Sequence, residues 1–257
     1  MGILNVTPDS FSDGGSYFNQ KRALEHASQM IQEGADILDV GGESTRPGAA
    51  AVSPAEEIKR VIPIIKSLRK KTDIAISVDT SKPEVADEAL RAGADIVNDV
   101  TGFRDKAMIQ ICADSNCGMV AMHMQGNPMT MQQAPQYQDV VLEVHEFLLR
   151  KHNELVEEGI DPERLVFDPG IGFGKSLKHN LSLLKNLGDL KVKDRPLLLG
   201  LSRKSMIGAL VDENDPAARS WPTVALTALG RIQGAAIHRV HEVQSNREAL
   251  QMAESLH

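Results

Sequence analysis

Short apolar segments rich in Ile, Val and Leu alternate along the chain with longer amphipathic stretches. Several of the short segments are almost wholly apolar, as strands are when a parallel sheet buries both of their faces. Eight segments are predicted as strands: residues 3–6, 37–40, 74–78, 96–98, 119–123, 165–168, 197–200 and 236–241. The stretches between them predict helices, most clearly over residues 21–33, 55–70, 83–92, 137–158 and 223–233.

Local signals mark where several of these helices begin and end. Ser53 precedes Pro54, which is typical of an N-cap followed by proline at the first helical position, and residues 81–84 have the same pattern. Glycines that follow the last periodic residue predict left-handed helix ends. They are Gly34, Gly93, Gly159 and Gly234.

Eight strands, each followed by a helix, predict an α/β protein of the (β/α)8 TIM barrel type. Dividing the 257 residues among eight units gives about 32 residues per unit, which fits this fold. No linker or low-complexity segment divides the chain, so we expect one domain over residues 1–257. The alternative is an open doubly wound sheet, but no G-x-G-x-x-G motif follows the first strand.

Composition narrows the class of protein. The chain has 28 Lys and Arg against 35 Asp and Glu, a net charge of −7, and aromatic residues make up only 4%. Both values argue against nucleic-acid binding, although local Arg and Lys can still bind a small anion. The two cysteines, Cys112 and Cys117, exclude a disulfide framework, and we expect free or structural thiols rather than a metal site.

Nothing in the sequence predicts a membrane protein or an exported one. No run of about 18 apolar residues is present. The first nine residues lack the basic and apolar regions of a signal peptide. We therefore expect a cytoplasmic protein without a membrane partner.

Polar residues end nearly every predicted strand. The active site of a (β/α)8 barrel lies at the C-terminal ends of its strands. These ends carry Asn5, Asp39, Asp79, Asn98, His123, Asp168, Lys204, Arg239 and His241. Unpaired buried carboxylates are costly, so a purely structural barrel would not need such a ring, and we expect a ligand site there. Whether His123 takes part or only packs is left open.

The chemistry of this rim points to particular ligand groups. Asp79, Asn98 and Asp168 suit a flat heterocycle with adjacent N–H donors, because a carboxylate can accept two parallel hydrogen bonds. A second group of side chains suits a phosphate-bearing ligand. It consists of Arg46, Lys204, Arg239 and His241.

Hard oxygen ligands and long loops complete the predicted rim. Asn5 and Asp13 suit Mg²⁺ that bridges phosphates with few protein contacts. Residues 7–15 and 41–48 are rich in Gly, Ser and Pro. We expect these two segments to be mobile lids, poorly ordered without ligand.

Two motifs give the sequence a specific resemblance. GILNVTPDSFSDGG at residues 2–15 resembles the first signature of the dihydropteroate synthase family, and GGESTRPG at residues 41–48 resembles the second. The resemblance continues in order through SVDT (77–80), NDV (98–100), MHMQG (122–126), DPGIGFGK (168–175), SRKS (202–205) and RVH (239–241). It covers essentially the whole chain.

The resemblance implies an activity and an assembly. Members of this family condense 6-hydroxymethyl-7,8-dihydropterin diphosphate with 4-aminobenzoate, giving 7,8-dihydropteroate and pyrophosphate in folate biosynthesis. They use magnesium, are typically homodimers and are targets of sulfonamides. The resemblance also implies a short extension before the first strand, which this sequence does not have; we expect its absence to affect stability rather than the rim.

The resemblance further implies a role for each matching residue. Asp79, Asn98 and Asp168 would hold the pterin edge, with Met122 and Lys204 lining that pocket. Asn5 would bind magnesium, assisted by Asp13, while Arg46, Arg239 and His241 would hold the diphosphate. The 4-aminobenzoate would be surrounded by Phe11, Thr45, Pro47, Phe173, Lys204 and Ser205. The residues expected to act in catalysis are Asp79, Asp168, Lys204 and Arg239.

The sequence offers no nucleophile for covalent catalysis. It contains neither a G-x-S-x-G elbow nor a recognisable Ser-His-Asp arrangement, so we expect a dissociative displacement. Gly174-Lys175-Ser176 does not complete a phosphate loop, because Pro169 stands where that motif needs glycine. Two alternatives to an active synthase stay open: a catalytically silent pterin-binding paralogue and a pterin-dependent methyltransferase.

Overall fold

The computed structural model describes residues 1–7, 16–44, 50–127 and 130–256. Its eight strands are all parallel to their neighbours. They are β1 (Gly2–Asn5), β2 (Ile37–Gly41), β3 (Ala75–Asp79), β4 (Ile96–Asp99), β5 (Gly118–Met122), β6 (Leu165–Asp168), β7 (Leu198–Leu199) and β8 (Ile237–His238). Strands β1 to β6 form one sheet in chain order, and β7 pairs with β8.

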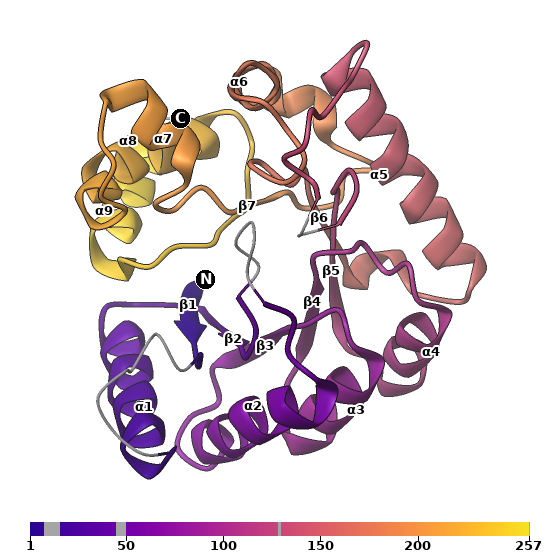
Figure 1. Ribbon diagram of the computed structural model, residues 1–257, viewed down its shortest axis with the longest axis vertical. Coiled ribbons are helices and arrows are strands. Elements are labelled where there is room, and N and C mark those ends of the chain that lie inside the picture. Colours follow the sequence, from indigo (N-terminus) through magenta and orange to yellow (C-terminus); the bar gives the residue numbers. More distant parts are fainter. Residues whose placement is uncertain (8–15, 45–49, 128–129, 257) are drawn as a thin grey trace.

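Single bridges between these two sheets close the barrel. Phe167 of β6 bridges Leu197 just before β7, and Gly2 of β1 bridges Val240 just after β8. The backbone N–H of Ile3 donates to Val240 O at 2.9 Å, and that of Val240 donates to Met1 O at 2.9 Å. The strands therefore form a closed ring in chain order, which confirms the predicted (β/α)8 barrel (Figure 1).

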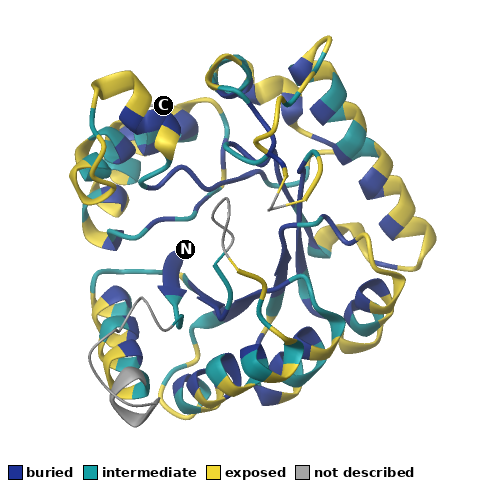
Figure 2. Cartoon of the chain, viewed as in Figure 1, coloured by how far each residue is buried: buried dark blue, intermediate teal, exposed yellow. Residues whose placement is uncertain are grey.

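Helices surround the strands (Figure 1). They are α1 (Ser16–Gln32), α2 (Pro54–Arg69), α3 (Pro83–Ala92), α4 (Lys106–Ser115), α5 (Val140–Glu157), α6 (Leu177–Lys185), α7 (Ser205–Val211), α8 (Ser220–Ile232) and α9 (Val243–Ser255). Short 3-10 turns add η2 (Pro162–Arg164), η3 (Leu187–Leu190) and η4 (Ala217–Arg219). Buried residues follow the strands and the inner faces of the helices (Figure 2). Among the described residues, no helix is long and apolar enough to span a membrane.

The helix-end signals are confirmed, with one exception. The Ser53 side chain accepts a hydrogen bond from Glu56 N at 3.3 Å. The four predicted glycines all have positive φ, between 87° and 108°. The exception is the start of α3, where the N-cap residue is Lys82 rather than Ser81 and makes no side-chain cap. A lysine ammonium group has no acceptor for a backbone N–H, so it cannot cap the helix; the Lys82 side chain pairs with Glu43 and Glu57.

The last two strands are shorter than predicted. Regular pairing covers only Leu198–Ile237 and Leu199–His238. The Arg239 N–H still donates to Leu199 O at 2.9 Å, so the chain continues beside β7 for one more residue. There the Arg239 side chain reaches past β1 to carboxylates on β2 and β3.

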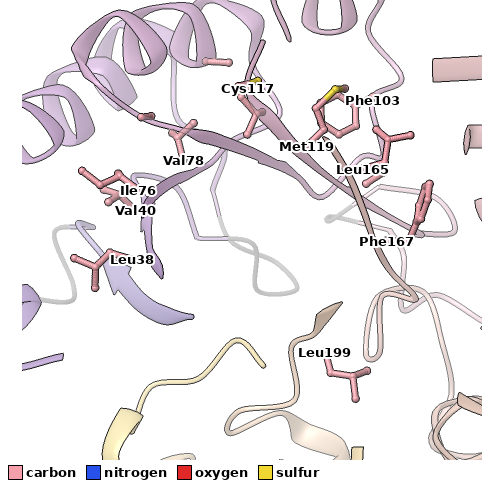
Figure 3. Close-up of a cluster of buried hydrophobic side chains, with 14 of the residues drawn as sticks. Leu38, Val40, Ile76, Val78, Phe103, Cys117, Met119, Leu165, Phe167 and Leu199 are labelled. Atoms are coloured by element: carbon pink, nitrogen blue, oxygen red, sulfur yellow. The ribbon is translucent and has the colours of Figure 1, made fainter. Parts of the chain in front are cut away.

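The main core lies between the strands and the helices that cover them (Figure 3). Its largest fully buried side chains include Phe103, Phe167 and Met119. Cys112 and Cys117 are part of this core and are both free, which confirms the prediction of free thiols. Among the described residues, no group of three or more His, Cys, Asp or Glu could hold a metal ion.

Candidate active site

The parallel register brings several predicted site residues into one row. Asn5 pairs with Gly41, Gly41 with Asp79, and Asp79 with Asn98. Further round the barrel, Met122 pairs with Asp168. Because neighbouring strands run in parallel, residues that end each strand share one edge, and these side chains gather at the C-terminal mouth.

Arg239 links two carboxylates across this mouth. Its Nε donates to Asp39 Oδ2 at 2.6 Å, and its Nη2 donates to Asp79 Oδ2 at 2.7 Å. Asn98 Nδ2 lies 3.3 Å from Asp39 Oδ2. Asp79 Oδ1 is buried and has no hydrogen-bond partner among the described residues. The cluster thus holds one cation and two carboxyl groups, and one carboxyl oxygen is left to accept a donor from a ligand.

Burial sets the acid–base properties of these groups. Burial raises the pKa of Asp79 to about 7, against the lowering effect of Arg239 and with a further increase from Asp39. Burial also raises the pKa of Asp168, which the nearby Lys204 ammonium opposes. For Arg239, burial lowers the pKa, but the Asp39 and Asp79 charges outweigh it and raise the pKa overall. Strongly perturbed groups in one cleft are typical of an active site.

A second cation lies beside Asp168. Lys204 Nζ donates to Ile171 O and lies 4.6 Å from the centre of the Phe173 ring. Burial lowers the pKa of Lys204 to about 8, although Asp168 raises it. Ser205 is the first residue of α7 and is exposed, whereas Met206 and Ile207 after it are buried.

His241 lies at the same mouth, after β8. Its Nδ1 is 2.9 Å from Ser202 Oγ, and its backbone N–H donates to the same oxygen at 3.2 Å. Next to it, Arg203 forms an ion pair with Glu242. Ser202 thereby joins the ends of β7 and β8 through hydrogen bonds on one hydroxyl group.

Comparison with known proteins agrees with this geometry. The family described as pterin binding enzyme matches residues 1–241. The chain belongs to the pterin-binding enzyme family. A dihydropteroate synthase of Escherichia coli (strain K12) is 48% identical over 255 residues, covering 99% of this chain and 90% of the relative.

Solved structures of the same class superpose closely on this pterin-binding enzyme. A Yersinia pestis dihydropteroate synthase in a sulfonamide drug complex has a TM-score of 0.94 and 44% identity, covering 100% of this chain and 93% of the other. A Xanthomonas albilineans dihydropteroate synthase with 4-aminobenzoic acid has a TM-score of 0.94 and 46% identity, covering 100% and 92%.

Part of the predicted site lies outside the described residues. This holds for Phe11, Asp13, Thr45, Arg46 and Pro47, and for most of the two predicted lids. The structure brings the other predicted residues of this pterin-binding enzyme to one rim. These are Asn5, Asp79, Asn98, Met122, Asp168, Phe173, Lys204, Ser205, Arg239 and His241.

Two charged residues were given no binding or catalytic role by the sequence: Asp39, which was expected only as one of the polar strand ends, and Lys175. Asp39 is fully buried and binds Arg239; a lone carboxylate inside an apolar strand was the available signal. Lys175 is buried beside His123, with its Nζ 2.8 Å from His123 Nδ1. No periodic pattern marks Lys175, because it lies in a glycine-rich loop. His123 is buried, with its ring edge-on to Phe147 at 4.8 Å between ring centres.

Proposed function

We infer that this chain catalyses the dihydropteroate synthase reaction, a transfer in folate biosynthesis. It condenses 6-hydroxymethyl-7,8-dihydropterin diphosphate with 4-aminobenzoate to form 7,8-dihydropteroate and pyrophosphate. The observation that carries this inference is the Asp39–Arg239–Asp79 cluster, whose unpartnered Asp79 Oδ1 lies beside Asn98 in a chain related over its whole length to synthases. Such a set of acceptors fits the N–H edge of a pterin.

The pterin edge is proposed to bind between β3, β4 and β6. Asp79, Asn98 and Asp168 supply carboxylate and amide groups from three strand ends, and Met122 ends the strand between them. All four side chains are buried, so a flat ring would find acceptors at its edge and an apolar thioether beside it. Arg239 uses the N–H of Nε and one N–H of Nη2 on two carboxylates, and its remaining N–H groups are proposed to donate to an anion at the mouth.

The 4-aminobenzoate is proposed to bind between Phe173, Lys204 and Ser205. The Lys204 ammonium group lies over one face of the Phe173 ring, so an aromatic surface and a positive charge adjoin one another there. Ser205 begins α7, where backbone N–H groups lack helical partners. The carboxylate of 4-aminobenzoate would accept hydrogen bonds there. Lys204 borders both the pterin and the 4-aminobenzoate regions.

The diphosphate is proposed to bind at Arg239 and His241, together with Arg46 from outside the described residues. For magnesium, the oxygen donors near Gly41 fit: a Cβ at Gly41 would lie 3.7 Å from Asn5 Oδ1 and 3.6 Å from Asp79 Oδ2. Mg²⁺ commonly binds few protein oxygens and takes phosphate oxygens and water for the rest. When bound, it would neutralise negative charge on the diphosphate. Asn5 would hold it, with Asp13 as the second predicted ligand.

The charges of the rim favour a dissociative mechanism. The bond between the pterin methylene carbon and the diphosphate oxygen breaks first, and its electron pair leaves with the diphosphate toward Arg239 and His241. Asp79 and Asp168 stabilise the resulting pterin cation, because they carry negative charge where the positive charge develops. The amine of 4-aminobenzoate then attacks the methylene carbon. Its proton leaves to pyrophosphate or water.

One assay tests this function. Purified protein is incubated with the pterin diphosphate, Mg²⁺ and 4-aminobenzoate, and pyrophosphate release is followed. We expect release that a sulfonamide inhibits competitively with 4-aminobenzoate. Ligand binding without release would indicate a silent paralogue, and no ligand binding would refute the proposal.

Asp168→Asn tests the assigned pterin edge. We expect weaker pterin binding and slower turnover, because the amide removes one of the charges that accept the pterin N–H groups. Lys178→Met, at an exposed position of α6, is the control. Unchanged pterin binding and turnover in Asp168→Asn would overturn this role.

We further propose that the chain forms a homodimer through α8. Trp221, Leu229 and Ile232 lie on one face of this helix, and all are exposed; Trp221 is 79% exposed. An exposed apolar stripe of this kind is typical of an interface, and a second copy of the same helix would cover it by two-fold symmetry. Light scattering should give a dimer for the native chain and a monomer for Trp221→Asp. Leu142→Asp, which changes an exposed leucine on α5, should stay dimeric.

The cytoplasmic location stays a prediction.

A further inference from the structure

The loop between β6 and α6 is bound by side chains at every carbonyl from residue 170 to residue 174. The donors come from several elements rather than from the loop's own backbone ladder. Lys175 Nζ binds Gly170 O (2.9 Å) and Phe173 O (3.0 Å), Lys204 Nζ binds Ile171 O, Gln132 Nε2 binds Gly172 O (2.5 Å) and Tyr137 Oη binds Gly174 O (2.9 Å). The shape of this loop therefore depends on which side chains surround it.

Lys175 is the buried centre of this arrangement. Only 3% of the residue is exposed, and its Nζ lies within hydrogen-bond distance of Gly170 O, Phe173 O and His123 Nδ1. An ammonium group has three hydrogens to donate, so three acceptors satisfy it. Burial, and then the charge of Lys175, lower the pKa of His123 to about 2, so the imidazole is neutral and its Nδ1 can accept.

The two carbonyls that Lys175 binds flank the one that binds Lys204. Phe173 N donates to Gly170 O at 3.0 Å, which closes a turn over residues 170–173. Within this turn, Ile171 O points to Lys204 Nζ, and the Phe173 ring lies under the same nitrogen. The turn thus supplies both the carbonyl oxygen and the aromatic ring that contact Lys204 Nζ.

The backbone of the turn also lies tightly against the end of β5. Gly170 has a φ of +66°, and a Cβ there would lie 1.8 Å from His123 O. Only glycine fits at this position. The same His123 provides the third acceptor for Lys175, so one residue fixes both the backbone and the ammonium group.

The anchor does not depend on the charge of Lys175. Burial lowers the pKa of Lys175 well below its usual range, the Asp168 charge raises it, and the Lys204 charge lowers it further. A lysine Nζ donates hydrogen bonds whether it is protonated or neutral, so the contacts with Gly170 O and Phe173 O hold in both states.

We propose that Lys175 is a positioning residue for the 4-aminobenzoate subsite. Its buried ammonium group holds the Gly170–Phe173 turn so that Ile171 O and the Phe173 ring orient Lys204. The kinetic test of this proposal rests on the proposed synthase activity. Lys175 itself contacts neither proposed substrate.

The kinetic test compares Lys175→Met with Lys178→Met. Methionine keeps the length of the side chain but cannot donate, and Lys178 is exposed on α6. For Lys175→Met we expect the KM for 4-aminobenzoate to rise at least tenfold, with the KM for the pterin diphosphate changed less than threefold. Both constants should be native in Lys178→Met. If Lys175→Met only reduces the amount of folded protein, kcat falls and both KM values stay native. That result would overturn the proposal.

A second measurement does not depend on turnover. With ¹³C-labelled lysine, the NMR signal of Lys204 Cε should shift in Lys175→Met and keep its native position in Lys178→Met. An unshifted Lys204 signal in Lys175→Met would overturn the proposal, whether or not the native chain has synthase activity. Absence of synthase activity in the native chain would refute only the proposed function. If Lys175→Met does not fold, Lys175→Gln keeps a donor but reaches less far, and the same two readouts apply with the same outcomes.

Discussion

The strongest test of the buried charge cluster is Asp79→Asn. Asp79 is 6% exposed, and burial raises its pKa from an ordinary 3.8 to about 7. Asp39 adds to this increase, while Arg239 opposes it. The folded chain therefore binds the Asp79 proton more tightly than the unfolded chain does. Ionising this carboxyl group destabilises the fold.

The size of the effect follows from proton linkage. Between pH 3.8 and about 7, the folded chain keeps the proton and the unfolded chain has lost it. The free energy of unfolding then falls by about 1.4 kcal/mol for each pH unit, and the total is about 4 kcal/mol. About 3 kcal/mol of this lies between pH 5 and 8. Asparagine cannot ionise, so the variant lacks this contribution.

At pH 8 the native chain carries the cost of burying the ionised Asp79, and the variant does not. The pKa of about 7 already includes the lowering effect of Arg239, so the loss of that charged contact is not subtracted a second time. Arg239 keeps its contact with Asp39, so no buried cation is left unpaired. We expect Asp79→Asn to be more stable than the native chain at pH 8, by up to about 4 kcal/mol, and to lose synthase activity.

Urea unfolding followed by circular dichroism at pH 5, 6, 7 and 8 measures this. The decisive quantity is the stability of the native chain minus that of the variant, because contributions from other titrating groups cancel in it. Asp73→Asn changes an exposed carboxyl group just before β3 and should give a difference that does not vary with pH. If the Asp79→Asn difference is equally flat, or grows in favour of the native chain as the pH rises, the reasoning is refuted.

Three further substitutions test packing and capping through the urea midpoint. Lys82→Met should lower the free energy of unfolding by about 3 to 5 kcal/mol, because it leaves the fully buried Glu57 without its cation. A decrease below about 1 kcal/mol would contradict this. Ser53→Ala should cost about 1 kcal/mol, because Glu56 N loses its cap, and Ser53→Asp should retain native stability. Phe167→Ala should cost about 3 to 5 kcal/mol through the cavity it leaves in the core, and a near-native midpoint would argue against tight packing there.

Much of the barrel could be predicted because its strands bury both faces. The apolar residues 165–167 mark a parallel strand without knowledge of its neighbours, and the strand that they begin has the predicted bounds of 165–168. The pairing that closes the barrel could not be predicted in this way. The regular pairing of β7 with β8 covers only two residues of each, and Arg239 just after β8 pairs with carboxylates 160 and 200 positions away in the sequence.

The site was predictable where polar residues interrupt an apolar pattern at a strand end, as Asp79 and Asp168 do. Lys175 gave no such signal. Its burial depends on the positive φ of Gly170, Gly172 and Gly174, which curl the loop around its ammonium group. Local sequence indicates that such glycines allow unusual turns, but the side chains that fill the turn are fixed only by packing against β5.

The carboxyl groups at the mouth of the barrel are costly to ionise, and this cost is informative. Among the described residues, burial raises the pKa of Asp79 although Arg239 opposes it, and raises the pKa of Asp168 although Lys204, Lys175 and Arg239 oppose it. A fold selected for stability alone would replace such groups with apolar ones, since buried charges are costly to desolvate. The carboxylates become favourable only when a ligand supplies N–H donors and then positive charge. The same residues that lower the stability of the empty barrel therefore provide its affinity for a cation that forms during the reaction.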